Sequence, residues 1–311
     1  MEKKATRESY GAALAALGEK YDFYVLDADL AAATKTSVFA KKYPERFFNC
    51  GIAEGNMMSV AAGIAAAGKT VFASSFAMFA AGRAFEQIRN SIGYPHLNVK
   101  IGATHAGITV GEDGATHQCN EDIALMRTIP GMVILNPADD VEATAAVEAA
   151  IKHTGPVYLR FGRCAAPIFN GADYKFELGK GVTLKDGADV TVVATGFMVH
   201  IAMEAAEMLE KEGISARVLN IHTIKPIDDA LLIKAAKETG ALVTAEEHSV
   251  IGGLGSAVAE VVSAACPVPV LRVGVEDTYG RSGTVPALLE AYGLTKEHIY
   301  QKAKEAISLK K

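Results

Sequence analysis

Short apolar runs alternate with longer segments of helical spacing along most of the chain. Residues 23–27 (FYVLD), 70–74 (TVFAS), 98–103 (NVKIGA) and 157–160 (VYLR) are such runs, and between them apolar residues recur every three or four positions. Strands that are apolar on both faces are typical of a parallel sheet with helices on both sides. The pattern therefore predicts an α/β fold.

The alternation is interrupted after Arg163. Residues 166–188 contain Pro167, four glycines and scattered charges without a sustained period. A second series of strands and helices begins at Asp189 with VTVVATG and continues to predicted helices near residues 285–292 and 296–308. We therefore expect two consecutive three-layer α/β/α domains, residues 1–165 and 189–311, connected by residues 166–188; the first should have a parallel sheet.

Two of the predicted helices have unusual sequences. Residues 53–68 (AEGNMMSVAAGIAAAG) are almost wholly apolar, so this helix should be buried on all sides. Residues 76–90 (FAMFAAGRAFEQIRN) predict one continuous helix directly after a strand.

Composition narrows the class of protein. The 311 residues carry a formal net charge of −5 and no basic stripe, which argues against nucleic-acid binding. No apolar run approaches the length of a membrane span, and the N-terminal MEKKATRESY lacks the apolar core of a signal peptide. The four cysteines show no CxxC spacing, so neither a zinc site nor a disulfide framework is indicated. We expect a soluble, cytoplasmic protein.

The loop of residues 102–118 (GATHAGITVGEDGATHQ) is the candidate active-site loop. It follows a predicted strand and precedes a helix, which is where open α/β sheets bind ligands. Its glycines permit close approach of the backbone, while His105, Asp113 and His117 supply hydrogen-bonding groups. Loops rich in Gly and Asp are also common as plain turns, although a turn does not need two histidines.

Four stretches, GIAEGNMMSVAAG, FASSFAMFAAGRAFEQIR, THAGITVGEDGATHQ and EEHSVIGGLGSAVAE, together resemble the C-terminal part of transketolase. The resemblance implies the pyrimidine-binding and C-terminal domains of a thiamine diphosphate enzyme. The family's diphosphate-binding domain carries a Gly-Asp-Gly motif, and no GDG occurs here. Because Met1 precedes a full predicted helix, we expect the separate C-terminal subunit of a split transketolase.

The resemblance assigns roles on the cofactor side. Glu54 would hydrogen-bond the aminopyrimidine ring and share its proton, Phe76 would stack on the ring, and Phe79 would form a wall. Asp29 would lie near the thiazolium ring. Without the resemblance, Glu54 would be a solvated residue in the first turn of a helix, and the two aromatics would be core residues.

On the sugar side the resemblance implies substrate contacts from Arg7, His105, Asp113, His117 and Arg160. Both histidines would also serve catalysis, and the two arginines would hold a phosphate through their guanidinium forks. Arginines at such positions otherwise usually form surface ion pairs.

Some positions depart from the family pattern. Ala33 stands where a phosphate-contacting serine is frequent, leaving Thr34, Thr36 or Ser37 as substitutes; Gly55 and Ala115 replace Gln and Pro. Phosphate preference is therefore open. Glu246, Glu247 and His248 precede GGLG at a helix start, which indicates packing and dimer contact rather than an anion site.

The implied activity is transfer of a two-carbon ketol unit from a ketose, or its phosphate, to an aldose, or its phosphate, through a carbanion on thiamine diphosphate. A partner subunit with a GDG motif would hold the diphosphate and Mg²⁺ or Ca²⁺, in an α2β2 heterotetramer. The alternatives are the β-subunit of a 2-oxo acid dehydrogenase, deoxyxylulose-phosphate synthase, which is normally a longer chain, and a non-catalytic scaffold. The retained Glu54 and Phe76 argue against the scaffold.

Overall fold

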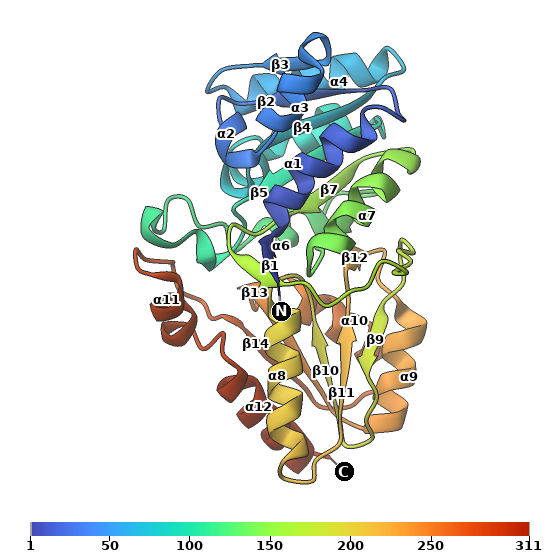
Figure 1. Cartoon of the computed structure of the whole chain (residues 1–311). Coiled ribbons are helices and arrows are strands. Elements are labelled where there is room, and N and C mark those ends of the chain that lie inside the picture. Colours follow the sequence, from blue (N-terminus) through green and yellow to red (C-terminus); the bar gives the residue numbers. More distant parts are fainter. Residues whose placement is uncertain (1, 311) are drawn as a thin grey trace.

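The chain folds into two α/β domains, one above the other in Figure 1, and the computed structural model describes residues 2–310. The first domain contains a seven-stranded sheet in the order β12-β6-β7-β5-β4-β2-β3, and every pairing except β12 with β6 is parallel. Its strands are β2 (Phe23–Asp27), β3 (Phe47–Asn49), β4 (Thr70–Phe76), β5 (Val99–Thr104), β6 (Val133–Leu135), β7 (Val157–Arg160) and β12 (Thr223–Lys225).

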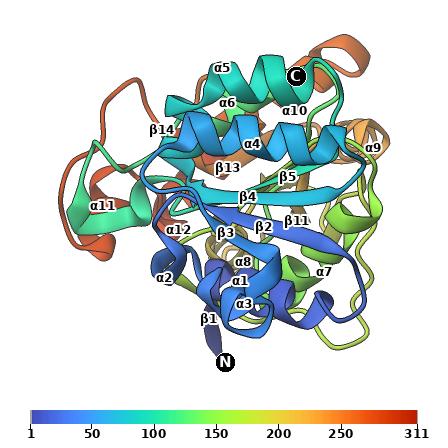
Figure 2. The same cartoon turned by 90° about the horizontal axis from the view of Figure 1, so that it is seen from above.

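Helices cover both faces of this sheet, as Figure 2 shows from above. One face packs against α1 (Thr6–Leu17), α3 (Ser37–Lys42) and α7 (Asp140–Lys152). The other packs against α4 (Glu54–Ala66), the π-helix η2 (Met78–Arg83), α5 (Phe85–Gln87), the π-helix η3 (Ile88–Gly93) and α6 (Asp122–Arg127). Shorter connecting elements are α2 (Ala31–Thr34), η1 (Pro44–Arg46) and η4 (Ile108–Asp113).

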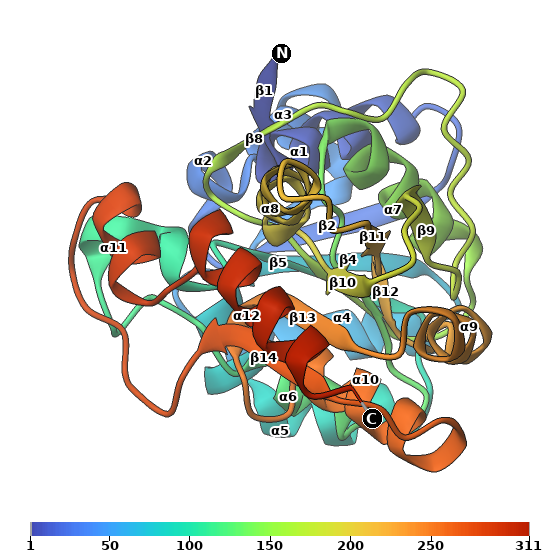
Figure 3. The same ribbon diagram turned by 90° about the horizontal axis from the view of Figure 1, so that it is seen from below.

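The second domain has a five-stranded sheet in the order β14-β13-β10-β11-β9, seen from below in Figure 3. Its strands are β9 (Val182–Lys185), β10 (Val190–Ala194), β11 (Ala216–Asn220), β13 (Leu242–Ser249) and β14 (Val270–Val275), of which β9 alone is antiparallel to its neighbour. One core contains α8 (Met198–Glu210), α11 (Val285–Ala291) and α12 (Lys296–Ser308), and the other contains α9 (Asp229–Thr239) and α10 (Leu254–Ala265). The predicted fold class is confirmed.

One strand of the second domain joins the sheet of the first where the two domains meet. β12 comes from the second domain and extends the first sheet at its edge. At the junction, β1 (Lys3–Ala5) pairs with β8 (Ala165–Pro167), and β9 arises from the predicted connection to become an edge strand of the second sheet. Among residues 2–310, no helix combines the length and the apolar character that crossing a membrane requires.

Two helix predictions are wrong. Helix α4 is buried on one face only: Val60 is 40% exposed, and its neighbours Ser59, Gly63 and Ala66 are exposed as well. The segment predicted as one helix over residues 76–90 instead begins inside β4 and continues as two π-helical stretches around α5. Widened π turns are frequent at functional sites.

A buried carboxylate also joins the domains. Glu142 on α7 accepts hydrogen bonds from the backbone of Ala138, from Asn220 on β11 and from Tyr174 in the connection. Complete burial raises the pKa of Glu142 from 4.5 to about 7, and these hydrogen bonds offset only part of the effect.

This shift makes stability depend on pH. Because the folded-state pKa lies above the unfolded one, the stabilisation from Glu142 is complete below about pH 4.5 and is lost as the pH rises through about 7. We expect the melting temperature of the wild type minus that of Glu142→Gln to fall between about pH 5 and about pH 8. Thermal unfolding of both proteins, monitored by circular dichroism at a series of pH values, measures this difference in melting temperature.

Glu148→Gln, on the same helix, is the control. The pKa of Glu148 is lowered to about 2, chiefly by its hydrogen bond from Lys20, so its contribution changes only below that range. An equally constant difference for Glu142→Gln would contradict the account.

Candidate active site

The predicted site residues gather at the carboxyl edge of the first sheet. Phe76 ends β4, His105 directly follows β5, and Asp29 follows β2 by two residues. Because these strands are parallel, their carboxyl ends share one edge, the usual ligand-binding edge of an open α/β sheet.

An aromatic row runs along this edge. The ring of Phe76 stacks on His105 with centroids 3.8 Å apart and lies nearly parallel to Phe79 at 5.8 Å. His117 meets both phenylalanines edge-on, at 6.4 and 5.3 Å. The structure therefore brings together four residues that the sequence analysis assigned separately to the cofactor and sugar sides.

His105 is held in a strained, buried position. It is 3% exposed, has a φ of 55°, and pairs its Nδ1 with the Thr104 hydroxyl at 2.9 Å. Burial, and then the positive charges of Arg7 and Arg163, lower the pKa of His105 to about 3. Its imidazole is therefore neutral at physiological pH and can donate one hydrogen bond and accept another.

Glu54 lies at the start of α4, 2% exposed. Its Oε2 accepts a hydrogen bond from Arg83 Nη1 at 2.8 Å. The Arg83 guanidinium also lies 4.5 Å from the centroid of the Phe79 ring. Glu54 is therefore buried beside the aromatic row and is not a solvated first-turn glutamate.

Positive charge collects beside His105. Arg7, Arg163 and Lys35 add to the effect of burial in lowering the pKa of His105, and burial, with a smaller effect of Arg163, lowers the pKa of Arg7. Arg7 donates through Nη1 to the carbonyl of Ala33 at 2.7 Å, while its buried Nε has no partner among the described residues. An unsatisfied buried donor next to further cations suits an anionic ligand.

The structure does not bring Arg160 to this cluster. The Arg160 side chain is 4% exposed, its Nε donates to Asp122 at 2.8 Å, and its Nη2 donates to the carbonyl of Glu247 at 2.8 Å. The guanidinium of Arg160 thus uses Nε and Nη2 to connect the two domains. We therefore do not include Arg160 in the proposed phosphate site.

Arg163 is the residue that sequence reasoning missed. It follows β7 by three residues, is partly exposed, and donates to the carbonyl of Val110. Its place in the loop beyond the strand end, not in the strand, was the available signal.

The candidate loop is fixed by the second domain. Thr109 donates its backbone N–H to the buried carboxylate of Glu247 at 2.7 Å, and α11 packs against η4, as Figures 1 and 3 show. Gly107 and Gly114 have φ values of 80° and 77°, and a Cβ there would collide with Glu247 and Ser282. Glycine is required at both positions. Asp113 lies exposed on this loop.

Two of the hydroxyl groups near Ala33 already donate hydrogen bonds within the protein. Thr34 and Thr36 donate to the buried carboxylate of Asp27 at 2.7 and 2.9 Å, so they do not face a ligand. Burial raises the pKa of Asp27, and these bonds oppose the shift. Asp29 instead pairs with Asn49 at 2.9 Å on the exposed edge.

Glu246 satisfies the helix start behind GGLG. It is fully buried and accepts from the backbone N–H groups of Leu254 and Gly255 at 2.6 and 2.8 Å. An internal carboxylate thus already occupies the N-terminus of α10, which agrees with a packing role.

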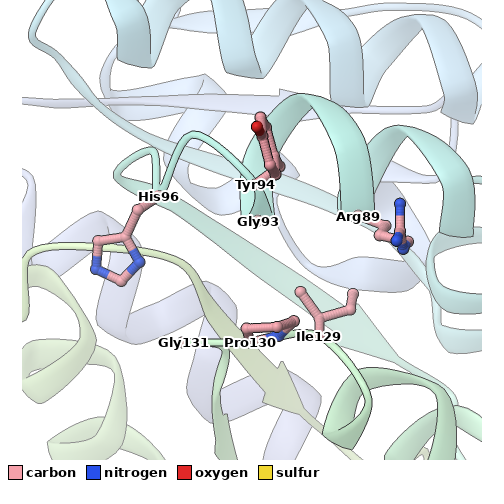
Figure 4. Close-up of a pocket in the computed structure, with 7 residues that line it drawn as sticks. All are labelled: Arg89, Gly93, Tyr94, His96, Ile129, Pro130 and Gly131. Carbon is pink, nitrogen blue, oxygen red and sulfur yellow. The ribbon is translucent and has the colours of Figure 1, made fainter.

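A separate hollow lies at the opposite edge of the sheet. Arg89, Tyr94, His96 and Pro130 line it with their neighbours (Figure 4), and its volume is about 360 Å³. Its residues precede β5 and β6, so it lies at the amino ends of these strands and away from the candidate active site.

Comparison with known proteins identifies the family. The model for the transketolase pyrimidine binding domain matches residues 2–167, and that for the transketolase C-terminal domain matches residues 179–299. The chain therefore belongs to the transketolase family, which uses thiamine diphosphate.

Relatives that match along the whole of both chains show which type of transketolase subunit this chain resembles. A protein of Methanocaldococcus jannaschii described as a transketolase C-terminal section is 51% identical over 306 residues, covering 97% of this chain and 96% of that protein. A 6-deoxy-6-sulfo-D-fructose transketolase subunit of Clostridium sp. is 44% identical over 311 residues, covering 100% and 97%. A solved structure described as a split gene transketolase, inactive beta4 tetramer, has a TM-score of 0.92 and 55% identity, and each chain covers 100% of the other. The chain is a transketolase-family subunit of this split type.

Substitutions of Arg160 and Arg163 should differ in how much they lower the free energy of unfolding. Arg160→Met leaves the buried Asp122 carboxylate unpaired and should cost about 3–5 kcal/mol of unfolding free energy. Arg163→Met breaks an exposed pair with Glu112 and a hydrogen bond to the carbonyl of Val110, and should cost about 1–2 kcal/mol. Denaturant unfolding of both variants measures the costs, and an Arg160→Met protein as stable as wild type would contradict the assignment.

Proposed function

We propose that this chain provides the aminopyrimidine-binding and sugar-binding half of a transketolase active site that moves a two-carbon ketol unit from a ketose to an aldose. The observation that carries the proposal is the buried Glu54 carboxylate, placed beside an aromatic row that ends at His105. A second chain would complete the site.

The residues fit the aminopyrimidine ring of thiamine diphosphate. A planar heterocycle needs an aromatic face and a hydrogen-bonding partner in an otherwise apolar pocket, which Phe76, Phe79 and Glu54 offer. Asp29 lies on the same sheet edge, on the side expected for the thiazolium ring. When bound, thiamine diphosphate supplies the nucleophilic carbon for cleavage of the ketose carbon–carbon bond.

The chain's own groups would bind and move protons. Glu54 would share a proton with a ring nitrogen through a hydrogen bond to its carboxylate. His105, as a neutral imidazole, would hydrogen-bond a substrate oxygen, and His117 would move protons there. The exposed carboxylate of Asp113 would accept a hydrogen bond from a sugar hydroxyl.

The substrate would be a sugar with an anionic end. Arg7 and Arg163, with Lys35 nearby, offer guanidinium donors to a phosphate, and the unpartnered Nε of Arg7 supplies one of them. A relative named for a sulfo-sugar makes a sulfonate the second possibility, since both groups are oxyanions. The pentose phosphates of the cytoplasm are the first donors to test.

A partner chain would cover the outer face of α4. Residues 55–68 carry no charge, and the exposed Val60 is joined on this side of the domain by Ile52, 79% exposed. Uncharged helix faces with small side chains allow close packing against another protein. We propose that the partner carries the GDG motif and holds the diphosphate with Mg²⁺ or Ca²⁺, in an α2β2 assembly. The inactive state of the related β4 tetramer agrees with the need for a second kind of chain.

Glu54→Gln tests the assignment. Two-carbon transfer from xylulose 5-phosphate to ribose 5-phosphate is measured for the chain alone and with a GDG-bearing partner recovered by pull-down. We expect activity only in the mixture, and a fall in kcat of about a hundredfold or more in Glu54→Gln, because an amide cannot share the proton. The exposed Glu86→Gln is the matched control. A Glu54→Gln complex with wild-type kcat would refute the role of Glu54.

Arg163→Met tests whether Arg163 binds the anionic end of the sugar substrate. Loss of a charged hydrogen bond should raise KM for xylulose 5-phosphate about tenfold to a hundredfold. For an unphosphorylated ketose, KM should stay unchanged. Equal changes for both donors would place Arg163 outside the anion site.

A further inference from the structure

One guanidinium lies between two of the groups that the aminopyrimidine ring needs. Arg83 Nη1 donates to Glu54 Oε2 at 2.8 Å, and the same guanidinium lies 4.5 Å from the centroid of Phe79. Among residues 2–310, Arg83 is the one side chain that hydrogen-bonds the Glu54 carboxylate.

These two contacts have the chemistry of the ring itself. A guanidinium is planar, stacks on aromatic faces and donates N–H groups to a carboxylate. A protonated aminopyrimidine bound to Glu54 would be another planar donor between the same carboxylate and the same aromatic wall. Both cannot occupy one place.

We propose that Arg83 competes with the aminopyrimidine ring for Glu54 and the Phe79 face, and that cofactor binding requires its side chain to swing out. This inference rests on the proposed function of the site. Arg83 thus acts as a positioning and regulatory residue, since it keeps the buried carboxylate paired until a ring that can donate to it arrives.

Arg83 is placed to move. Its side chain is 53% exposed, and the hydrogen bond to Glu54 is the one bond its guanidinium makes to any described residue. It lies at the end of the π-helix η2, which also carries Phe79, so displacement of the side chain leaves the aromatic wall in place. Swinging out therefore breaks one ion pair and one cation–π contact, and hydration of the freed cation offsets part of this loss.

The competition lowers the apparent affinity for the cofactor. When a ligand must first displace an internal partner, its apparent dissociation constant equals the intrinsic one divided by the fraction of sites that are free. An ion pair with one exposed partner corresponds to a factor of about three to ten.

The test is calorimetric titration of thiamine diphosphate, with Mg²⁺, into the complex of this chain with its GDG-bearing partner. Arg83→Met keeps an aliphatic stem over Phe79 and removes the charge, so we expect about three- to tenfold tighter binding. Arg83→Lys keeps a charge without a planar fork and should fall between wild type and Arg83→Met. Arg89→Met, which removes an exposed arginine from η3, should bind as wild type does.

A double-mutant cycle isolates the ion pair. In a Glu54→Gln background Arg83 no longer has a carboxylate to hold, so Arg83→Met should give no further gain in affinity. A gain of equal size in both backgrounds would show that Arg83 acts without Glu54, and would overturn the proposal.

Two further outcomes of the titration would refute different claims. If the wild-type complex binds thiamine diphosphate and Arg83→Met binds it equally or more weakly, the competition is refuted, and Arg83 instead holds Glu54 in position for the ring. If no form of the complex binds the cofactor, the proposed function itself fails, and the competition fails with it. Binding by Arg83→Met but not by wild type would be the strongest form of the expected result.

Discussion

The guanidinium of Arg160 lies buried where the two domains meet, and the shape of the candidate active site depends on its bonds. It donates to Asp122 at the start of α6 and to the backbone of Glu247 on β13, whose carboxylate in turn holds the N–H of Thr109. Burial raises the pKa of Glu247, and the charge of Arg160 opposes that shift. The candidate loop is thereby fixed to the second domain rather than free at a sheet edge.

This arrangement explains the division of work between the domains. The first domain presents the aromatic row and Glu54 on its own strands and helices. The second domain contributes no side chain to that row, but it fixes the loop that positions Asp113 and His117, through Glu247 and the contact of α11 with η4. Burial, together with the nearby positive charges of Arg7, Arg163 and Lys35, lowers the pKa of His105.

The sequence was sufficient for the fold class because strands buried on both faces are mostly apolar, as in the FYVL of β2. It also placed His105 in a loop directly after a strand, whereas Phe76 was singled out by the resemblance to transketolase and ends β4 rather than starting a helix. It could not predict Arg83, whose direction depends on a π-helical turn that an α-helical period does not reveal. Arg160 lies in the predicted strand of residues 157–160 and Arg163 lies beyond it, a difference that the sequence shows but that the resemblance to transketolase did not use. Helix α4 was misjudged because apolar periodicity predicts burial without saying which molecule provides the cover.

The central claim is that this chain holds half of a shared cofactor site, and the direct test is the stoichiometry of thiamine diphosphate binding. Titration calorimetry on this chain alone, on the GDG-bearing partner alone and on their equimolar mixture would measure it. The account predicts one cofactor bound per pair of chains, with full affinity only in the mixture. Stoichiometric binding of equal affinity by this chain alone would contradict it.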